Sequence, residues 1–391
     1  MLRQNRSNEM TGSHIVLVIY SLTVSGAARR VLALAGAFAE QGLRVTLVTV
    51  DPGGGLRSAV PEGVRLRVLA PRLAASEASG RRRKQRVWRA LPKLVWLIAR
   101  LRPHFLMAGA NHVHLVCFVA RLLCPVHRPK LVLRISNSIG RGSDDVGGRS
   151  RAMVALRRRA FRSADLLISV SRAVARDAER CLRLSPGCVL TLPNPVVDTE
   201  QVERLASRDV GHPWFVAGEP PVVLGVGRLH PQKDFGCLIQ AVATLSRSRP
   251  VRLILLGEGP ERARLVQMAQ ACGIADSVDL PGQVANPFAY MRAADVTVLS
   301  SRWEGMPGVL AEAMACGCPV VSTDCPGGSR EMLDDGRLGP LVTVGDADAL
   351  AAGIRQALDR PPSTDALQQQ AKAYMIHEAA IAYSKALTPL I

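Results

Sequence analysis

The sequence predicts an α/β protein made of two consecutive doubly wound domains, each a parallel sheet with helices on both faces. Short continuous apolar runs of strand length alternate with helix-period segments along most of the chain. The alternation stops at Leu192-Pro193-Asn194-Pro195, because two prolines exclude both helix and central strand. A length of 391 residues, 48% of them hydrophobic, suffices for a core in each half.

The first half opens with the spacing of a βαβ unit. Strands are expected over residues 14–20 and 43–50, and the helix expected over 27–41 stops before Gly42, a typical helix-ending residue. Further strands are expected over 64–69, 105–108, 131–135, 165–170 and 189–192. The helices between them are expected over 85–102, 112–123, 151–162 and 173–184.

A second βα series follows a linker over residues 193–220. Its strands are expected over 222–228, 251–257, 278–280, 296–300 and 319–323. Its helices are expected over 234–246, 260–272, 287–293, 308–316 and 349–358. We therefore predict Rossmann-like domains over 1–195 and 196–365, and a final helix over 366–391 that packs back on the first domain. Ligands of such sheets bind at the carboxyl ends of the strands, so we expect the two domains to face a central cleft.

Charge is divided unevenly between the halves. Residues 1–195 hold 33 lysines and arginines against 10 acidic residues, whereas residues 196–391 hold 17 against 22. The first half is therefore expected to meet an anionic partner: nucleic acid, an anionic membrane or a phosphate-bearing substrate. Solubility from arginine-rich composition alone is the alternative.

Cysteine usage and the chain start favour a reducing compartment. The nine cysteines form no C-x2-C pair, so structural zinc is not expected, and no signal peptide is recognised in MLRQNRSNEMTGS. No apolar run reaches the roughly 18 residues that span a bilayer.

An E-x7-E arrangement carries the most chemical information. Glu304 lies in a Gly/Pro loop after a predicted strand, and Glu312 lies one to two turns into the next helix. Pro307 suits the first helical position, which leaves the N–H groups of the Gly305–Gly308 segment free to attract an anion. Glu312 can bond the vicinal hydroxyls of a ribose and Glu304 those of a hexose. An exposed loop glutamate and a helix-surface glutamate are the alternative interpretation.

Two cations follow the first strand of the second domain. Arg228 and Lys233 in GVGRLHPQKDF can pair with a diphosphate, the arginine as a two-pronged donor and the lysine as a point charge. Glu258, between two glycines in LLGEGPERARL, can bond a base or a ribose, although an ordinary βα turn explains that segment equally well. Solvated surface cations are the alternative for the pair.

The first domain offers weaker candidates. Ser25 and Gly26 form a small-residue loop before a helix, and Asn111, His112 or His114 can reach a sugar hydroxyl after a strand. The two histidines are two residues apart and would face different ways on a helix, so a metal pair is not expected. Two other segments have simpler interpretations: Asp346-Ala347-Asp348 as a helix cap, and residues 51–55 as a flexible loop.

The stretch Arg81–Pro103 is basic and amphipathic. It carries seven cations over residues 81–93 and an apolar stripe at helical spacing, with Trp88 and Trp96 beside it. Attraction to anionic lipid of about 1 kcal/mol per cation could hold a peripheral protein at a membrane. A helix packed on the sheet, with a solvated basic end, is an equal alternative.

Together these motifs resemble the family-4 retaining glycosyltransferases, which have the GT-B fold. The resemblance is clearest over residues 225–341, where AMACGCPVVSTDCPGG joins the segments above, and SGAARRVLALA matches the family's first loop more weakly. Ala28, Ser25 and His104 depart from the residues usual in the family. The resemblance implies Arg228 and Lys233 on the donor diphosphate, Glu312 on the ribose and Glu304 on the sugar. It places the remaining donor contacts at Gly227, Glu258, Gln283, Val284, Gly305, Met306, Pro307 and Val309.

The expected activity is transfer of a hexose or N-acetylhexosamine from a nucleotide-diphosphate sugar, UDP favoured over GDP, with retention at the anomeric carbon. The acceptor would be a lipid-linked or other saccharide in bacterial surface-polysaccharide synthesis. We expect no metal and no resident cofactor, and a cytoplasmic protein held peripherally at the inner membrane face through Arg81–Pro103. No nucleic-acid partner is expected, because aromatic and basic residues do not interleave. The alternatives are a nucleotide-sugar epimerase of the same fold and a non-catalytic anion-binding protein.

Overall fold

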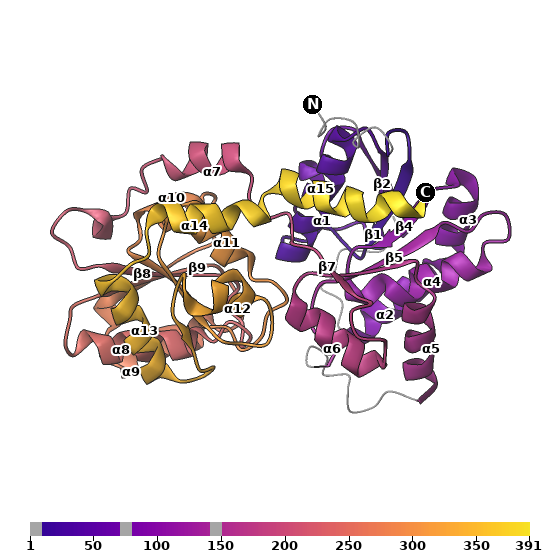
Figure 1. The fold of residues 1–391 in the computed structure, drawn as a ribbon. Helices are drawn as coiled ribbons and strands as arrows, with labels where there is room; N and C mark the ends of the chain where they lie inside the picture. Colours follow the sequence, from indigo (N-terminus) through magenta and orange to yellow (C-terminus); the bar gives the residue numbers. More distant parts are fainter. Residues whose placement is uncertain (1–9, 71–79, 141–150) are drawn as a thin grey trace. The chain divides into compact units, whose positions relative to one another are not determined.

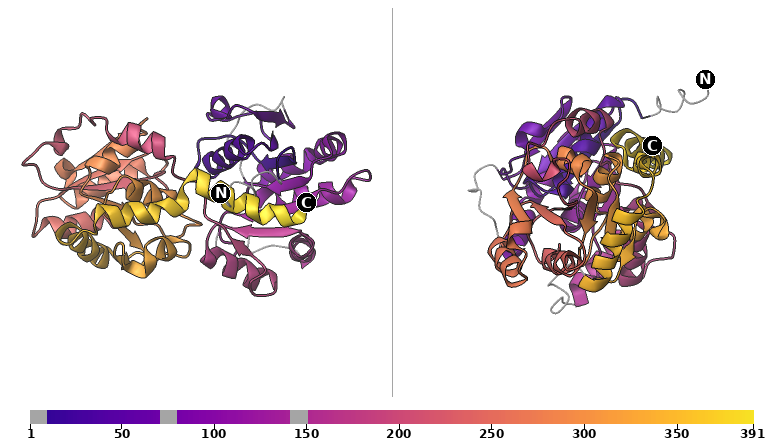
Figure 2. Two further views of the ribbon diagram at one scale, coloured as in Figure 1. Left: turned by 45° about the horizontal axis from the view of Figure 1, so that its top comes forward. Right: turned by 90° about the vertical axis from the view of Figure 1, so that its left-hand side faces the viewer.

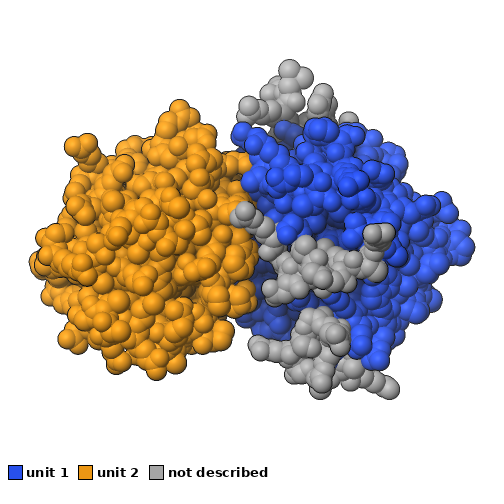
Figure 3. Space-filling view, turned by 90° about the horizontal axis from the view of Figure 1, so that it is seen from below, with its two compact units in different colours: residues 1–195, 376–391 blue, residues 196–375 orange. Residues whose placement is uncertain are grey.

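A computed structural model of the protein describes residues 10–70, 80–140 and 151–391, with only the helical path given for residues 80–82 and 151. The chain forms two compact units (Figure 3). Unit 1 comprises Met1–Pro195 and Ile376–Ile391, and unit 2 comprises Val196–Met375. Each unit contains one parallel sheet, so the predicted fold class of two doubly wound α/β domains is confirmed.

The sheet of unit 1 has seven strands in the order β3-β2-β1-β4-β5-β6-β7, all parallel. The strands are β1 (His14–Ile19), β2 (Arg44–Thr49), β3 (Val64–Val68), β4 (Phe105–Ala108), β5 (Lys130–Ile135), β6 (Leu166–Ser169) and β7 (Leu190–Thr191). The strand order reverses between β1 and β4, and such reversals are where doubly wound sheets bind ligands.

Helices cover both faces of this sheet (Figure 1). They are α1 (Gly26–Glu40), α2 (Gly80–Arg89), α3 (Leu91–Leu101), α4 (His114–Leu123), α5 (Arg151–Arg162), α6 (Arg172–Leu182) and α15 (Ile376–Leu387). Helices α1 and α15 pack together on one face, where Phe38 meets Tyr383 edge to face at 6.5 Å between ring centroids. Figure 2 shows α15, in yellow, lying along unit 1.

Unit 2 repeats the pattern with six strands in the order β10-β9-β8-β11-β12-β13. The strands are β8 (Val222–Val226), β9 (Arg252–Leu256), β10 (Val278–Gly282), β11 (Val296–Leu299), β12 (Val320–Thr323) and β13 (Leu341–Val342). The helices are α7 (Thr199–Ala206), α8 (Phe235–Ser246), α9 (Arg262–Ala271), α10 (Pro287–Ala293), α11 (Gly308–Ala315), α12 (Ser329–Met332), α13 (Ala347–Asp359) and α14 (Thr364–Ala371). The strand order reverses between β8 and β11.

Some elements differ from the sequence-based expectation, among them β13 and α12, which were not predicted. The helix predicted over 85–102 is two helices, α2 and α3, which meet at Ala90 because Pro92 belongs in the first turn of a new helix. The linker predicted over 193–220 contains α7, which Asp198 caps by accepting from the Gln201 N–H at 3.1 Å. The chain returns to unit 1 at residue 376 rather than 366, because α14 packs on α11 inside unit 2.

The basic stretch 81–103 packs its apolar stripe on the protein. Val87, Leu94 and Ile98 are buried, and so are Ala90 and Leu97. The stripe therefore belongs to the core of unit 1, as the alternative interpretation expected. Trp96 remains 61% exposed on the other side of α3, with the Arg100 guanidinium 5.5 Å from its ring centroid.

Candidate active site

The predicted donor residues of unit 2 follow four neighbouring strands at one edge of the sheet. Gln283 and Val284 follow β10, Glu258 follows β9, Lys233 follows β8, and Glu304 follows β11. Parallel strands present their carboxyl ends at the same edge, so the topology gathers these residues on both sides of the point where the strand order reverses.

The closest contact among them joins Lys233 to Glu304. The Lys233 Nζ lies 2.7 Å from the Glu304 Oε1, and the Ser301 hydroxyl donates to the same oxygen at 2.8 Å. The lysine side chain is 19% exposed and the glutamate side chain 11% exposed. The geometry of this pair is constrained, because the Glu304 Oε1 is held by two donors from different loop positions. Ser301, three residues before Glu304, was not among the predicted site residues.

The loop before α8 is fastened to the loop before α11. The Ser300 hydroxyl donates to the Lys233 carbonyl at 2.7 Å, and the Gln232 side-chain amide donates to the Trp303 carbonyl at 2.9 Å. The Arg302 Nε donates to the Asp234 carboxylate at 2.8 Å. Lys233 is therefore held through its backbone as well as through its ammonium group. None of these linking side chains was predicted, because their partners lie some seventy residues away in sequence.

The end of β12 and the loop that follows it contact the loop that carries Glu304. The Glu304 N–H donates to the Pro326 carbonyl at 3.0 Å, and the Thr323 hydroxyl donates to the Ser301 carbonyl at 2.6 Å. At Gly327, which has φ +147°, a Cβ would lie 2.4 Å from the Glu304 carbonyl oxygen. Glycine is thus required where the STDCPGG segment touches the glutamate loop.

Close backbone approach also joins the loops after β8 and β9. At Gly257, with φ +141°, a Cβ would lie 1.9 Å from the Gly227 carbonyl oxygen. The next residue, Glu258, is exposed and pairs with Arg262 at 3.1 Å. Its Oε1 lies 2.8 Å from where a Cβ of Gly282 would stand, so Glu258 lies beside the loop that carries Gln283 and Val284.

The remaining predicted donor residues surround the start of α11. Helix α11 begins at Gly308, as expected, with Pro307 as its N-cap rather than at its first helical position. Met306 and Val309 are buried, and Glu312 is half-buried on the second turn. Arg228 is exposed, and no ion pair joins it to another residue of the described ranges. The edge therefore combines a solvent-accessible cation with a helix N-terminus, both of which stabilise negative charge.

In unit 1, two of the predicted acceptor residues have structural roles. Ser25 caps α1 by accepting from the Ala28 N–H at 3.3 Å, and Gly26 is exposed at the first helical position. The Asn111 amide joins two loops, accepting from the Ser136 N–H at 2.9 Å and donating to the Asn137 carbonyl at 2.9 Å. Both Ser25 and Asn111 thus have structural partners.

The two histidines face different ways, as their spacing predicts. His114 is buried, with its Nε2 2.9 Å from the Arg134 carbonyl oxygen and its ring edge-on to Phe161. Burial lowers the pKa of His114 to about 3, so it is a neutral core residue and we do not retain it as an acceptor contact. His112 is exposed and lies edge-on to the Tyr20 ring, with 5.8 Å between the ring centroids.

Other polar candidates have structural explanations. Asp346 caps α13 by accepting from the Ala349 N–H at 2.9 Å, as expected. Burial raises the pKa of Cys316 and of Cys318 to about 12, so both are protonated core thiols. Within the described ranges, no group of three or more histidine, cysteine or acidic side chains is arranged to hold a metal ion.

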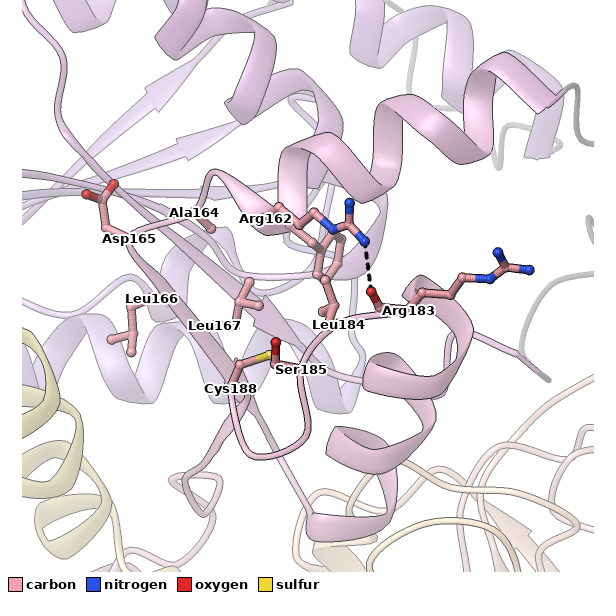
Figure 4. A pocket seen from close by; sticks show the side chains of 10 residues that line it. Arg162, Ala164, Asp165, Leu166, Leu167, Arg183, Leu184, Ser185 and Cys188 are labelled. Atoms are coloured by element: carbon pink, nitrogen blue, oxygen red, sulfur yellow. Dashed lines mark hydrogen bonds between the residues drawn. The ribbon is translucent and has the colours of Figure 1, made fainter.

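A cavity of about 440 Å³ lies in another part of unit 1 (Figure 4). It is lined by residues at the ends of α5 and α6 and at the amino ends of β6 and β7, including Arg162, Arg183 and Cys188. The Arg162 Nη2 donates to the Arg183 carbonyl at 3.0 Å, which satisfies the end of α6. The cavity is therefore at the sheet edge opposite to the strand carboxyl ends.

The two-unit fold and the site of unit 2 define a glycosyltransferase, and comparison with known proteins agrees. The model of Glycosyltransferase Family 4 matches residues 24–201, and that of Glycosyl transferases group 1 matches residues 213–374. The chain belongs to these glycosyltransferases and has their GT-B fold.

Curated relatives match over part of their length. The chain is 30% identical over 212 residues to N-acetylgalactosamine-N,N'-diacetylbacillosaminyl-diphospho-undecaprenol 4-alpha-N-acetylgalactosaminyltransferase of Campylobacter jejuni, covering 54% of this chain and 56% of that protein. It is 38% identical over 138 residues to the lipopolysaccharide core biosynthesis glycosyltransferase LpsE of Rhizobium meliloti, covering 35% and 39%. The matches span about half the length of the first relative and less of the second.

Solved structures share the fold over nearly the whole chain. The Anabaena protein Alr3699/HepE in complex with UDP and glucose aligns with a TM-score of 0.77 at 20% identity, covering 96% of this chain and all of that one (100%). Sucrose-phosphate synthase of Thermosynechococcus elongatus aligns with a TM-score of 0.79 at 20% identity, covering 97% and 99%. Across the part of the chain that the structure describes, none of the helices combines the length and apolarity of a bilayer-spanning segment.

Proposed function

We propose that the protein transfers a hexose or N-acetylhexosamine from a UDP-sugar to a saccharide acceptor, with retention at the anomeric carbon. The observation that carries this proposal is the Lys233–Glu304 pair at 2.7 Å, held at the strand edge of unit 2 beside the start of α11. A cation and a carboxylate side by side offer one group for a diphosphate and one for sugar hydroxyls.

Each donor role follows from the chemistry of its side chain. Arg228, exposed after β8, binds the diphosphate as a two-pronged hydrogen-bond donor. Lys233 already contacts the Glu304 carboxylate and binds the diphosphate as its second anion. Glu304 accepts from hydroxyls of the transferred sugar, and Glu312 on α11 accepts from the ribose. The departing diphosphate is then stabilised mainly by these two cations and by the α11 N-terminus. Retention without a covalent nucleophile is part of the proposal.

The choice of UDP over GDP is supported by analogy alone. Structural neighbours with the same fold are described as complexes with UDP, with UDP and glucose, and with UDP-glucose. A UDP- and GDP-sugar screen for acceptor-dependent nucleotide release tests this choice. Release from GDP-sugars alone would refute it, and NMR of the product's anomeric configuration tests retention.

Surface-polysaccharide synthesis is the proposed process, because curated relatives act in lipopolysaccharide core synthesis or on a diphospho-undecaprenol substrate by name. A nucleotide-sugar epimerase is the second candidate within enzymes. It would convert the donor without an acceptor, so acceptor-independent turnover of a UDP-sugar distinguishes it from a transferase. Binding of DNA that persists at physiological salt, with no sugar turnover, would favour a non-catalytic anion-binding protein.

Peripheral association with the cytoplasmic face of the inner membrane is proposed for the stretch Arg81–Pro103. Trp88 and Trp96 are exposed, at 37% and 61%, among several cations of α2 and α3. The test is sedimentation of the whole protein with phosphatidylglycerol vesicles and with phosphatidylcholine vesicles. Trp96→Ala should weaken binding to the anionic vesicles. Equal recovery with both vesicle types, or no effect of the substitution, would contradict the proposal.

A further inference from the structure

One face of α2 directs cations towards the sheet of unit 1. Arg83, Arg86, Val87 and Ala90 are spaced i, i+3, i+4 and i+7, which places them on one side of the helix. Val87 and Ala90 are buried, so this side contacts the unit. Arg89, three residues beyond Arg86 and at the margin of this side, is exposed. Arg83 is also exposed and Arg86 is half-buried, so the side of α2 that contacts the unit carries one solvent-accessible arginine and one that is partly enclosed.

These arginines meet residues that follow three adjacent strands. Tyr20 follows β1, Asp51 follows β2, and His112 follows β4. The Tyr20 and His112 rings contact each other edge to face, with 78° between their planes, and thus lie at the point where the strand order reverses. Ligands of doubly wound sheets bind at this point, so the arginines of α2 are beside the expected ligand position of unit 1.

Only one of the two arginines is neutralised by a carboxylate. The Arg86 Nη1 lies 2.6 Å from the Asp51 Oδ2, and the Gly53 N–H donates to the other carboxylate oxygen at 2.9 Å. The Arg83 guanidinium lies 6.0 Å from the centroid of the Tyr20 ring. No ion pair joins Arg83 to a residue in the ranges that the structure describes. Residues 51–55, expected to be a flexible loop, thus contribute a buried carboxylate that fixes α2 in place.

The two rings beside Arg83 carry no negative charge, and the Tyr20 hydroxyl donates to the Asp51 Oδ2 at 3.4 Å. Desolvation, followed by the nearby Arg83 charge, lowers the pKa of the exposed His112 below its usual range, so the imidazole is neutral at pH 7. Desolvation also raises the pKa of Tyr20, so its hydroxyl stays protonated. A guanidinium with neutral donors beside it and no competing carboxylate of its own is suited to an anion with several acceptor oxygens.

We propose that Arg83, together with Tyr20 and His112, binds a phosphate group carried by the acceptor substrate. This site rests on the proposed function for its place in the reaction, since it makes unit 1 the side that holds a phosphate-bearing acceptor. The proposal assigns the side of α2 that contacts unit 1 to substrate binding. The other side of the helix remains available for contact with another surface. The phosphate can come from a polyprenyl diphosphate or from a free phosphorylated compound.

The test is calorimetric titration of the whole protein, without vesicles, with geranyl diphosphate, with geraniol and with inorganic pyrophosphate. The titrations are repeated in the Lys233→Ala variant, so that occupation of the candidate donor site does not contribute. Arg83→Gln should weaken binding of geranyl diphosphate at least about tenfold, the loss expected for a charge-assisted contact. Pyrophosphate that binds as well as geranyl diphosphate would identify phosphate alone as the ligand, and weaker pyrophosphate binding would identify a prenyl contribution.

Arg89→Gln is the matched control, because it removes one positive charge from an equally exposed position of the same helix, six residues beyond Arg83. Its affinity should stay within about twofold of the unmodified protein. Equal weakening by both substitutions would overturn the proposal in favour of a general basic surface. Geraniol that binds as tightly as geranyl diphosphate would also overturn it. So would the absence of binding by both geranyl diphosphate and pyrophosphate. Arg83→Lys, which keeps the charge, should retain part of the affinity. A separate titration with UDP measures binding at the candidate donor site. The proposed function and the Arg83 site can therefore fail independently, and the two failures are distinguishable.

Discussion

Lys233 and Glu304 come from the loops after β8 and β11 and meet at 2.7 Å, where the strand order of unit 2 reverses. The pair is supported by bonds from three loops, so its geometry exists before any donor binds. Preorganised charge is what a reaction that expels an anionic leaving group requires.

Lys233→Ala should reduce sugar transfer at least about a hundredfold, because one of the two cations opposite the diphosphate is lost. The fold should survive, since Ser301 still donates to Glu304. Acceptor-dependent UDP release and thermal melting measure the two effects. Lys372→Ala, at an exposed lysine of unit 2, is the control and should be fully active. Full activity of the Lys233 variant would remove the diphosphate role from this residue.

Gly257→Ala should destabilise the protein by at least about 3 kcal/mol, because a Cβ there would lie 1.9 Å from the Gly227 carbonyl oxygen. Gly273→Ala is the matched control. Gly273 also has a positive φ, +70°, but a Cβ there meets nothing within 4 Å, so about 1 kcal/mol is expected. Urea unfolding measures both, and equal losses would mean that backbone strain alone, without the close approach, decides the effect.

Arg134→Met should destabilise unit 1 by at least about 3 kcal/mol. Arg134 is 2% exposed, and its guanidinium donates to the Gly109 carbonyl, the Asn194 side chain and the Tyr383 hydroxyl. Because Tyr383 lies on α15, hydrogen exchange in that helix should accelerate. Arg128→Met, at an exposed arginine, is the comparison. An unchanged melting curve for the Arg134 variant would show that these three groups find other partners.

Stability should fall as the pH drops below about 6.5, in part because of His114. Burial lowers its folded-state pKa to about 3, below the ordinary histidine pKa of about 6.5, so between these values the unfolded chain binds more protons than the folded one. The contribution is fully present above pH 6.5 and is lost as the pH falls towards 3. His114→Gln should therefore flatten the dependence of the melting temperature on pH between 7 and 4. A variant with the same acid sensitivity would contradict this origin.

Chelation should leave transfer unaffected. The donor site proposed here relies on Arg228, Lys233 and a helix end for charge, and none of its acidic residues is grouped as a metal site in the described ranges. Activity is measured after dialysis against EDTA and again after Mg²⁺ or Mn²⁺ is restored. Loss on chelation with recovery on addition of either ion would show that the diphosphate is held differently.

The fold was predictable from the sequence because buried parallel strands are continuous apolar runs, and both units consist of them. The break between α2 and α3 was missed because the apolar stripe continues through Ala90 in the same helical phase. Likewise, α7 lies in a segment that two prolines precede, and its signal is only the cap at Asp198.

The candidate site was predictable in part. Arg228, Lys233, Glu258 and Glu304 each follow a strand, so residue type and position sufficed to select them. Ser301, Gln232 and Asp234 have no such signal, because their roles depend on which loops become neighbours, and that follows from strand order. Arg83 and Asp51 were missed for the same reason: α2 reads as a uniformly basic helix until its inward side is known.

The return of the chain at residue 376 has a consequence for synthesis on the ribosome. Tyr383 and Leu387 belong to the same buried cluster as Ile15 and Phe38, so the first unit lacks part of its interior until the last residues have emerged. Unit 2 is complete by residue 375 and needs no later segment. Although N-terminal domains generally fold first during translation, here the second unit can finish before the first, which waits for α15, made after unit 2.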